Sequence, residues 1–402
     1  MRKNKSRIAC LILLLLFIFP LPVSAGLSSF NINGYVKYLF SSSKTPAVDE
    51  RLNANLIHAR LNAQWYPSEA LRAGLGLRMR AYYGNLIEKT PDFLTQIKNH
   101  YEYGRLDAVL WDREKSVGYA QIDRLWLDYS KGNIETTIGR QRIAWGTALV
   151  WNVIDLFNPQ SILDFDYEEK PGVDALRIQY YTGAVSKIEL SAKPAKNRDK
   201  TITAGLFSVN YSGYDFYGIA GERNNRRVLG GAWAGAIAKA GFRGEFLISE
   251  APDKSAPAML PDLSDFGTSF FKYDKPTASA VLSADYTFSN SFYIHTEALY
   301  NSIGKTRNAG VFYQEALQAG LLSPSRWSIF QEFSYDITPL LRGSIFAIFN
   351  PDDGSSLIVP RFRWSITANL DFTLIAFSAH GAHFTEWGDY GNSVFTRFKY
   401  SF

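Results

Sequence analysis

Val394-Phe395-Thr396-Arg397-Phe398-Lys399-Tyr400-Ser401-Phe402, the C-terminal stretch of the chain, decides the predicted fold. Alternate side chains of a β-strand point to opposite faces, so every second residue back from Phe402 lies on one aromatic and apolar face. The opposite face carries the cations Arg397 and Lys399, and Phe395 is out of pattern. A strand that is apolar on one side and charged on the other suits a wall between lipid and water.

A strand that ends on an aromatic residue in this way resembles the C-terminal signature of bacterial outer-membrane β-barrels. The resemblance implies that Phe398, Tyr400 and Phe402 form a signal that the barrel-assembly machinery recognises. It also implies a location in the bacterial outer membrane, with lipid against the outer face.

The N-terminus predicts secretion. Residues 1–25 begin with four basic residues, continue with the apolar stretch 8–19, and end on Val23-Ser24-Ala25, which is typical of a cleaved signal peptide. The apolar stretch is short of the roughly 20 residues that a membrane-spanning helix needs. Cys10 lies inside it and lacks the preceding pattern of a lipoprotein site. We therefore expect one domain, a barrel of residues 26–402.

Composition excludes several function classes. The whole chain has 43 basic and 38 acidic residues, and removing the four basic residues of 1–25 leaves 39 against 38. The sequence pI of about 9.0 thus gives no support to nucleic-acid binding. The one cysteine leaves with the signal, which rules out disulfides and thiolate metal sites. No later apolar run reaches 18 residues, so a helical membrane protein is excluded, and 15% aromatic residues suit interfacial girdles.

Period-two patterning predicts an all-β, transmembrane antiparallel β-barrel of about 18 strands, with 16 as the alternative. Residues 55–65 and 71–80 form the clearest hairpin. Short turns are predicted at Pro67-Ser68-Glu69, Lys131-Gly132, Thr182-Gly183, Ser212-Gly213, Ala240-Gly241, Ser289-Asn290, Thr338-Pro339 and Ala368-Asn369. Longer outer connections are predicted at about 41–52, 85–116, 144–171, 194–200, 223–226, 251–275, 304–324, 350–355 and 381–391.

Alternation along the strands predicts which charges line the pore. The inward cations are Lys37, Arg60, Arg72, Arg78, Arg80, Arg361, Arg363, Arg397 and Lys399. Because the first and last strands are neighbours in a closed barrel, these residues gather on one wall. The clearest inward acids lie nearer the opposite wall, at Glu245, Asp285, Glu297 and Glu332.

The connection 144–171 is too apolar for an outer loop in open water. We expect it to fold into the lumen as a constriction, with Trp151, Leu156 and Phe157 on the wall and its acids facing the basic wall. A rim contact or a subunit interface is the alternative. The constriction residues are Trp151, Asp155, Asp164, Asp166, Glu168 and Glu169. The predicted arrangement resembles the third loop of general porins.

Two arginines precede this loop in Gly139-Arg140-Gln141-Arg142-Ile143. Simple alternation would point Arg140 and Arg142 toward lipid, so we expect a bulge at Gly139 that turns them into the pore, or a position near the rim. The motif from Gly139 to Pro159 resembles one in porin-like barrels of bacteria, with a looser likeness to alginate-export-type barrels.

These features predict a porin, an outer-membrane channel for passive diffusion of small hydrophilic solutes, and no enzyme. The alternatives are a rim-active outer-membrane enzyme, an adhesin-type barrel or a polysaccharide-export barrel. His380 and His383 would point to opposite faces of a strand, which disfavours a shared metal site. We therefore expect no catalytic residues, metal or cofactor, and a homo-oligomer stays open.

Overall fold

The computed structural model describes residues 30–46, 48–98, 103–158, 166, 169, 171–197, 200–252 and 263–402. The expected signal peptide 1–25 and the acids Asp164 and Glu168 lie outside the described residues.

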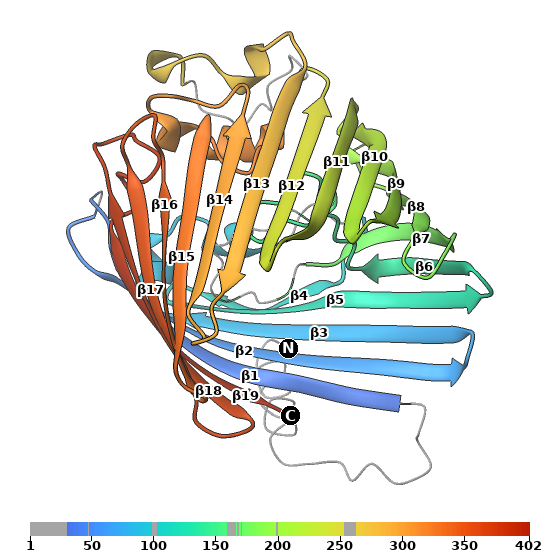
Figure 1. The fold of residues 1–402 in the computed structure, drawn as a ribbon. Helices are drawn as coiled ribbons and strands as arrows, with labels where there is room; N and C mark the ends of the chain where they lie inside the picture. Colours follow the sequence, from blue (N-terminus) through green and yellow to red (C-terminus); the bar gives the residue numbers. More distant parts are fainter. Residues whose placement is uncertain are drawn as a thin grey trace.

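The described strands form one closed antiparallel sheet (Figure 1). Eighteen of its 19 strands make the ring. The ring closes where β1 pairs with β19, from Tyr35 opposite Ser401 to Lys44 opposite Asn392. In chain order the ring strands are β1 (Phe30–Lys44), β2 (Leu52–Ser68), β3 (Leu71–Tyr83), β5 (Ser116–Lys131), β6 (Ile134–Gln141), β7 (Val173–Tyr181), β8 (Lys187–Lys193), β9 (Ile202–Tyr211), β10 (Tyr214–Arg223), β11 (Arg226–Ile237), β12 (Ala240–Ser249), β13 (Thr277–Thr287), β14 (Tyr293–Asn301), β15 (Trp327–Thr338), β16 (Leu341–Phe349), β17 (Ser356–Ser365), β18 (Leu370–His380) and β19 (Asn392–Ser401).

The extra strand β4 (Asp107–Arg113) lies within the outer connection between β3 and β5 and pairs with the first part of β5. It occupies the side of β5 that β6 leaves open, because β6 pairs with β5 only from Leu125 onward. The same connection contains the short helices α2 (Asn85–Lys89) and α3 (Phe93–Ile97). The sequence predicted this segment as a loop, since β4 alone is too short and polar to stand out.

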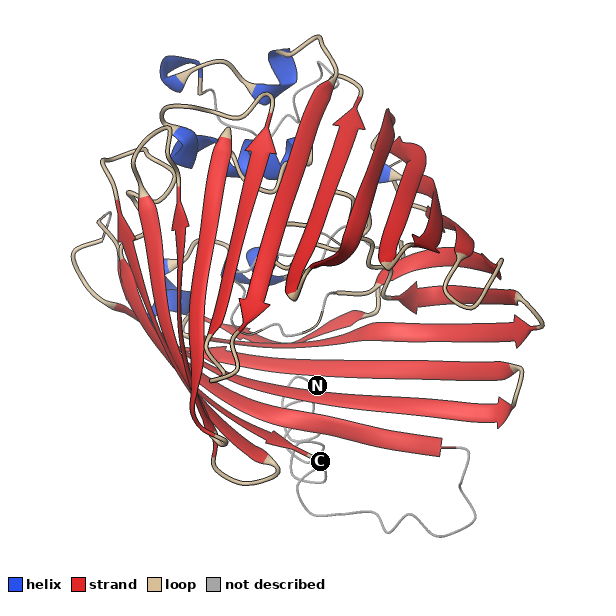
Figure 2. Ribbon diagram, viewed as in Figure 1, coloured by secondary structure: helices blue, strands red, loops and turns tan. Residues whose placement is uncertain are grey.

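The eight predicted turns are confirmed, each within two residues (Figure 2). The outer connection predicted at 223–226 is reduced to the two residues Asn224 and Asn225, with φ of 55° and 57°. Asparagine tolerates this left-handed conformation, which a two-residue hairpin requires. Other outer connections carry η2 (Ser264–Phe266), η3 (Phe270–Lys272), η4 (Ala309–Phe312) and α4 (Tyr313–Ala319).

The outer face of the wall is apolar, as alternation predicts. Ile138 of β6 and Leu190 of β8 are 57% and 59% exposed there. Aromatic residues within three positions of the short-turn ends of their strands form a girdle on this face: Trp65, Tyr129, Tyr180, Tyr211, Tyr335, Trp364 and Tyr400. An apolar band edged by aromatic residues is the exterior of a barrel that sits in lipid.

Among the described residues, no helix has the length and apolar character needed to cross a membrane.

Candidate channel constriction

The connection between β6 and β7 enters the barrel (Figure 1). Its apolar side chains pack against the inward-facing apolar residues of β7 and of β9 to β18. Trp151 makes an edge contact with Phe330 of β15, with ring centroids 6.4 Å apart, and Trp145 contacts Phe157 at 5.0 Å. The buried loop residues are Ile143, Trp145, Ala148, Trp151, Val153, Ile154, Leu156 and Phe157. The apolar content of this loop is thus buried against the inner wall.

Two buried glutamates hold the loop backbone. Glu245 of β12 accepts hydrogen bonds from the N–H groups of Thr147, Ala148 (2.8 Å) and Ile154 (3.3 Å). Glu297 of β14 accepts from Trp151 (2.7 Å), Leu149 (3.1 Å) and Val150. A loop without regular structure leaves backbone N–H groups unsatisfied, and a carboxylate is a strong acceptor for them. We call Glu245 and Glu297 the anchor pair.

The anchor pair corrects one expectation. Both residues face inward, as the alternation predicted, but the loop covers them, so that they are 1% and 0% exposed. They therefore do not present an acidic wall to the pore water. The other two predicted inward acids are paired with arginines, Asp285 with Arg243 and Glu332 with Arg361.

The opposite wall is basic, and its residues are aligned by strand register. Lys37 of β1 lies opposite His58 of β2 and Lys399 of β19, and His58 lies opposite Arg80 of β3. The next inward row pairs Arg60 of β2 with Arg78 of β3. Cross-strand partners share a face of the sheet, so these side chains form two adjacent rows. We call this set the basic wall.

We call the connection between β6 and β7 the inner loop. Two of its acids contact the basic wall. Asp166 lies 3.1 Å from Lys37 Nζ and 2.9 Å from His58 Nδ1. Glu169 lies 3.2 Å from one terminal nitrogen of Arg60, and the other terminal nitrogen of Arg60 donates to Asp123 of β5 at 2.7 Å. The loop is therefore fixed at both sides, by its backbone on β12 and β14 and by Asp166 and Glu169 on β1 and β2.

The remaining predicted cations of the inner face have these partners: Arg72 pairs with Asp128, Arg78 donates to Gln121, Arg80 to Tyr82 and the Ile97 carbonyl, Arg361 to Ser344, Arg363 pairs with Asp371, and Arg397 donates to Thr373.

Arg140 and Arg142 differ from the expectation. Arg140 lies opposite Leu125 and Asp174, on the side of the wall that carries Ile138, and its guanidinium pairs with Asp174 at 2.7 Å. Gly139 has φ of +110°, but β6 stays in register with both neighbours there. Arg142 is exposed just beyond the end of β6. Both arginines thus lie at the outer end of β6, where the connection to β7 begins.

The expected bulge lies on the neighbouring strand. Gly76 of β3 pairs with Arg124 and Leu77 pairs with Ile122, so Asp123 of β5 is the extra residue. A bulge puts two consecutive side chains on one face. Asp123 thus reaches Arg60 while Arg124 also faces inward. The adjacent charges Asp123-Arg124 in an otherwise alternating segment were the available sequence signal.

Asp155 also differs from its predicted place. It is 1% exposed and accepts a hydrogen bond from the Asn158 N–H at 3.0 Å, so it closes a turn within the loop and does not face the basic wall.

At the barrel seam, Phe402 extends the pairing of β19 with β1. Its N–H and carbonyl exchange hydrogen bonds with Gly34 at 3.0 and 2.9 Å. Phe398, Tyr400 and Phe402 are exposed on the outer face, while Phe395 packs against the inner cluster.

No family model matches the sequence, and the search of curated proteins found no match. Solved structures do match. Acinetobacter baumannii OccAB4 has a TM-score of 0.60 and 8% identity, over 94% of this chain and 99% of that one. Acinetobacter baumannii OccAB1 has 0.57 and 9%, over 93% and 96%. Pseudomonas aeruginosa OccD3 (OpdP) has 0.55 and 8%, over 94% and 92%.

At this identity the likeness establishes the fold, which is that of bacterial outer-membrane porins. With its closed ring and apolar exterior, the chain is a bacterial outer-membrane β-barrel. The predicted fold class, resemblance and location are confirmed.

Proposed function

We propose that the barrel is a passive channel for small hydrophilic solutes and not an enzyme. The inner loop carries this proposal, because it is fixed between the anchor pair and the basic wall inside a ring of 18 strands. Barrels of 16–18 strands leave an aqueous channel. A loop bound to both walls narrows that channel without needing to move during passage.

The charges of the proposed pore support a mild preference for anions. Acids partner several inward cations, Arg60, Arg72 and Arg363 among them, which reduces the field along the lumen. Arg80 contacts neutral groups, the Tyr82 hydroxyl and the Ile97 carbonyl, and so adds positive potential near the narrow section. Pore selectivity follows from the charges that line the passage.

We further propose that residues 1–25 are a cleaved secretion signal and that the barrel-assembly machinery recognises Phe398, Tyr400 and Phe402. The exposure of these three aromatic side chains on the outer face of the last strand supports their recognition before the barrel closes.

Planar-bilayer recording tests the channel proposal. The detergent-folded protein is expected to insert and conduct in steps, while heat-denatured protein from the same preparation gives none. Folded protein that inserts without conducting would contradict a channel and favour the rim-active enzyme or adhesin. Liposome-swelling assays with neutral solutes of increasing size would then give the size limit of the channel.

A further inference from the structure

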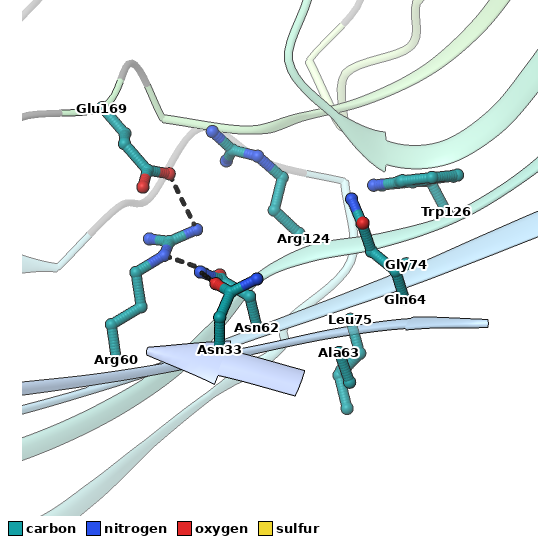
Figure 3. Close-up of a pocket in the computed structure, with 10 residues that line it drawn as sticks. All are labelled: Asn33, Arg60, Asn62, Ala63, Gln64, Gly74, Leu75, Arg124, Trp126 and Glu169. Carbon is teal, nitrogen blue, oxygen red and sulfur yellow. Dashed lines mark hydrogen bonds and ion pairs between the residues drawn. The ribbon is translucent and has the colours of Figure 1, made fainter. Parts of the chain in front are cut away.

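A cavity of about 230 Å³ lies next to the contact between the inner loop and the basic wall, toward the short-turn ends of β2 and β3 (Figure 3). It is bounded by inward side chains of β1, β2 and β5 and by Glu169. In Figure 3 the polar side chains converge on one space, while Ala63 and Leu75 point away from it.

Trp126 provides a flat surface in this cavity. It pairs in register with Gly74 of β3, and a Cβ atom on Gly74 would lie 2.3 Å from Cε2 of the indole. The glycine therefore lets the ring lie across the neighbouring strand, and Figure 3 shows it edge-on along the sheet. One face of the indole is covered by the β3 backbone, which leaves the other face toward the cavity.

Amide groups surround this surface and keep hydrogen-bonding capacity. Asn62 donates to Asn33 Oδ1 at 3.0 Å and accepts from Arg60 Nε at 2.8 Å, and Gln64 Oε1 accepts from the Tyr66 hydroxyl at 2.7 Å. Among the described residues, no acceptor partners the N–H groups of Asn33 Nδ2, Gln64 Nε2 and Trp126 Nε1. Each of them is a donor with no competing lone pair, which suits the oxygen of a hydroxyl group.

Among the described residues, the cations at the cavity have acidic partners that balance much of their charge. Arg60 lies between Asp123 and Glu169, and Arg124 lies 3.4 Å from Asp123. Arg60 and Arg124 line the cavity, Glu169 lies on it, and Asp123 lies behind it, so an added charged group would gain attraction from one sign and repulsion from the other. This balance favours a neutral polar ligand over a carboxylate or an amine.

We propose that this cavity is a binding site for one pyranose ring of a neutral sugar in transit. The proposal rests on the channel function and names a substrate class for it. The apolar C–H face of the ring would stack on the free face of Trp126, with hydroxyls bonded by Asn33, Gln64 and the Arg60–Glu169 pair. A volume of about 230 Å³ is below the roughly 300–1,000 Å³ of sites for larger ligands, which suits one ring.

Glucose is the probe, and sorbitol is its matched control, because sorbitol has the hydroxyl groups but no ring face. Glucose is expected to reduce the single-channel current in KCl reversibly, at a lower half-blocking concentration than sorbitol. Trp126→Ala should raise the half-blocking glucose concentration about three- to tenfold, as expected for loss of one aromatic contact. Gln64→Ala should shift it in the same direction by less.

Trp65→Ala is the control variant. It removes the same kind of side chain from β2, at a position that is 49% exposed on the outer face, so glucose block should be unchanged. A glucose titration of intrinsic fluorescence in detergent-folded protein gives the same comparison without current. It therefore decides the sugar site even if the protein does not conduct.

Three results would overturn the sugar site: equal block by glucose and sorbitol, block by glucuronate but not glucose, or an unchanged response in Trp126→Ala. If Trp126→Ala does not fold, an unchanged response in Gln64→Ala has the same force. Conduction without any glucose effect would reject this site and leave the channel intact, whereas absence of conduction would reject the channel itself.

Discussion

At the scale of single residues, the anchor pair holds the inner loop in place. Glu297 alone accepts hydrogen bonds from three backbone N–H groups of this loop. Glu297→Gln removes the negative charge and turns one acceptor into a donor that faces N–H groups. Hydrogen bonds to a charged group contribute roughly 1.5–3 kcal/mol, so the loop should be held less firmly by about that amount.

The expected result of Glu297→Gln is greater open-channel current noise and faster proteolysis within the loop of the folded barrel. Glu332→Gln is the control, because Glu332 also faces inward but pairs with Arg361 of the wall. Noise and proteolysis that match those of the control would mean that packing alone holds the loop.

Glu386 links three outer connections at their base. It lies in the connection 381–391 and accepts hydrogen bonds from Ser323 and Ser325 at 2.8 and 2.7 Å, while its N–H donates to Asp353. Burial, with a further contribution from the charge of Asp353, raises the pKa of Glu386 from 4.5 to about 7. Between about pH 4.5 and 7, the Glu386 carboxyl therefore keeps its proton in the folded loops and loses it in the unfolded loops.

The sign of the pH effect follows from this difference. Below about pH 4.5 the carboxyl is neutral in both states, and its burial costs least. As the pH rises toward about 7, the contribution of this group lowers the free energy of unfolding of the loops by on the order of 2–3 kcal/mol. We predict that these loops are cleaved faster at pH 8 than at pH 5 by a protease active at both. Glu386→Gln should remove most of the difference, and Glu250→Gln, at an exposed glutamate, should retain it.

At the scale of elements, the inner loop is expected to restrict flow. Deleting residues 150–168 removes Trp151 and also Asp166 with its contacts to Lys37 and His58, so single-channel conductance should rise. The deletion also uncovers apolar wall residues such as Phe330, which makes heat-modifiable migration a necessary check of folding. Shortening the outer connection at 195–199 is the control. A folded deletion variant with wild-type conductance would show that the narrow section lies elsewhere.

Two variants of Phe402 distinguish its role in closing the barrel from its role in recognition by the assembly machinery. Phe402→Asp keeps the two backbone hydrogen bonds to Gly34 and removes the aromatic ring, whereas deletion of Phe402 removes both. If assembly recognises the ring, both variants should give less heat-modifiable barrel in the outer membrane. Ser401→Ala, on the inner face, should be normal. A defect in the deletion alone would assign Phe402 a role in closure and not in recognition.

The whole barrel was predictable to the extent that its structure is local. Alternation sets the two faces of each strand, and Gly, Asn or Pro at a turn sets where it ends, so the ring and its turns followed from short windows. The place of the inner loop followed from its apolar content. The anchoring of the loop could not be predicted in this way, because the acceptors of the Thr147 and Leu149 N–H groups lie 98 and 148 residues away in the sequence. The Asp123 bulge likewise depends on the fit between two strands.

Ion preference belongs to the whole molecule, because it sums the charges of all the wall. Replacing Arg78, Arg80, Arg361 and Arg363 by Ser removes four inward cations and leaves Glu332 and Asp371 without these partners. The reversal potential in a KCl gradient should shift toward cation preference. The shift should be larger at low salt, where the screening length exceeds the roughly 8–10 Å of physiological solutions.

Arg227→Ser is the matched control, because this arginine is 83% exposed at the outer end of β11 and pairs with Glu250. It removes the same kind of charge from outside the passage, so its reversal potential should be that of the wild type. The quadruple variant should still fold, since strand register places all four arginines on the wet face. A folded quadruple variant with an unchanged reversal potential would mean that ions pass along a path these arginines do not line.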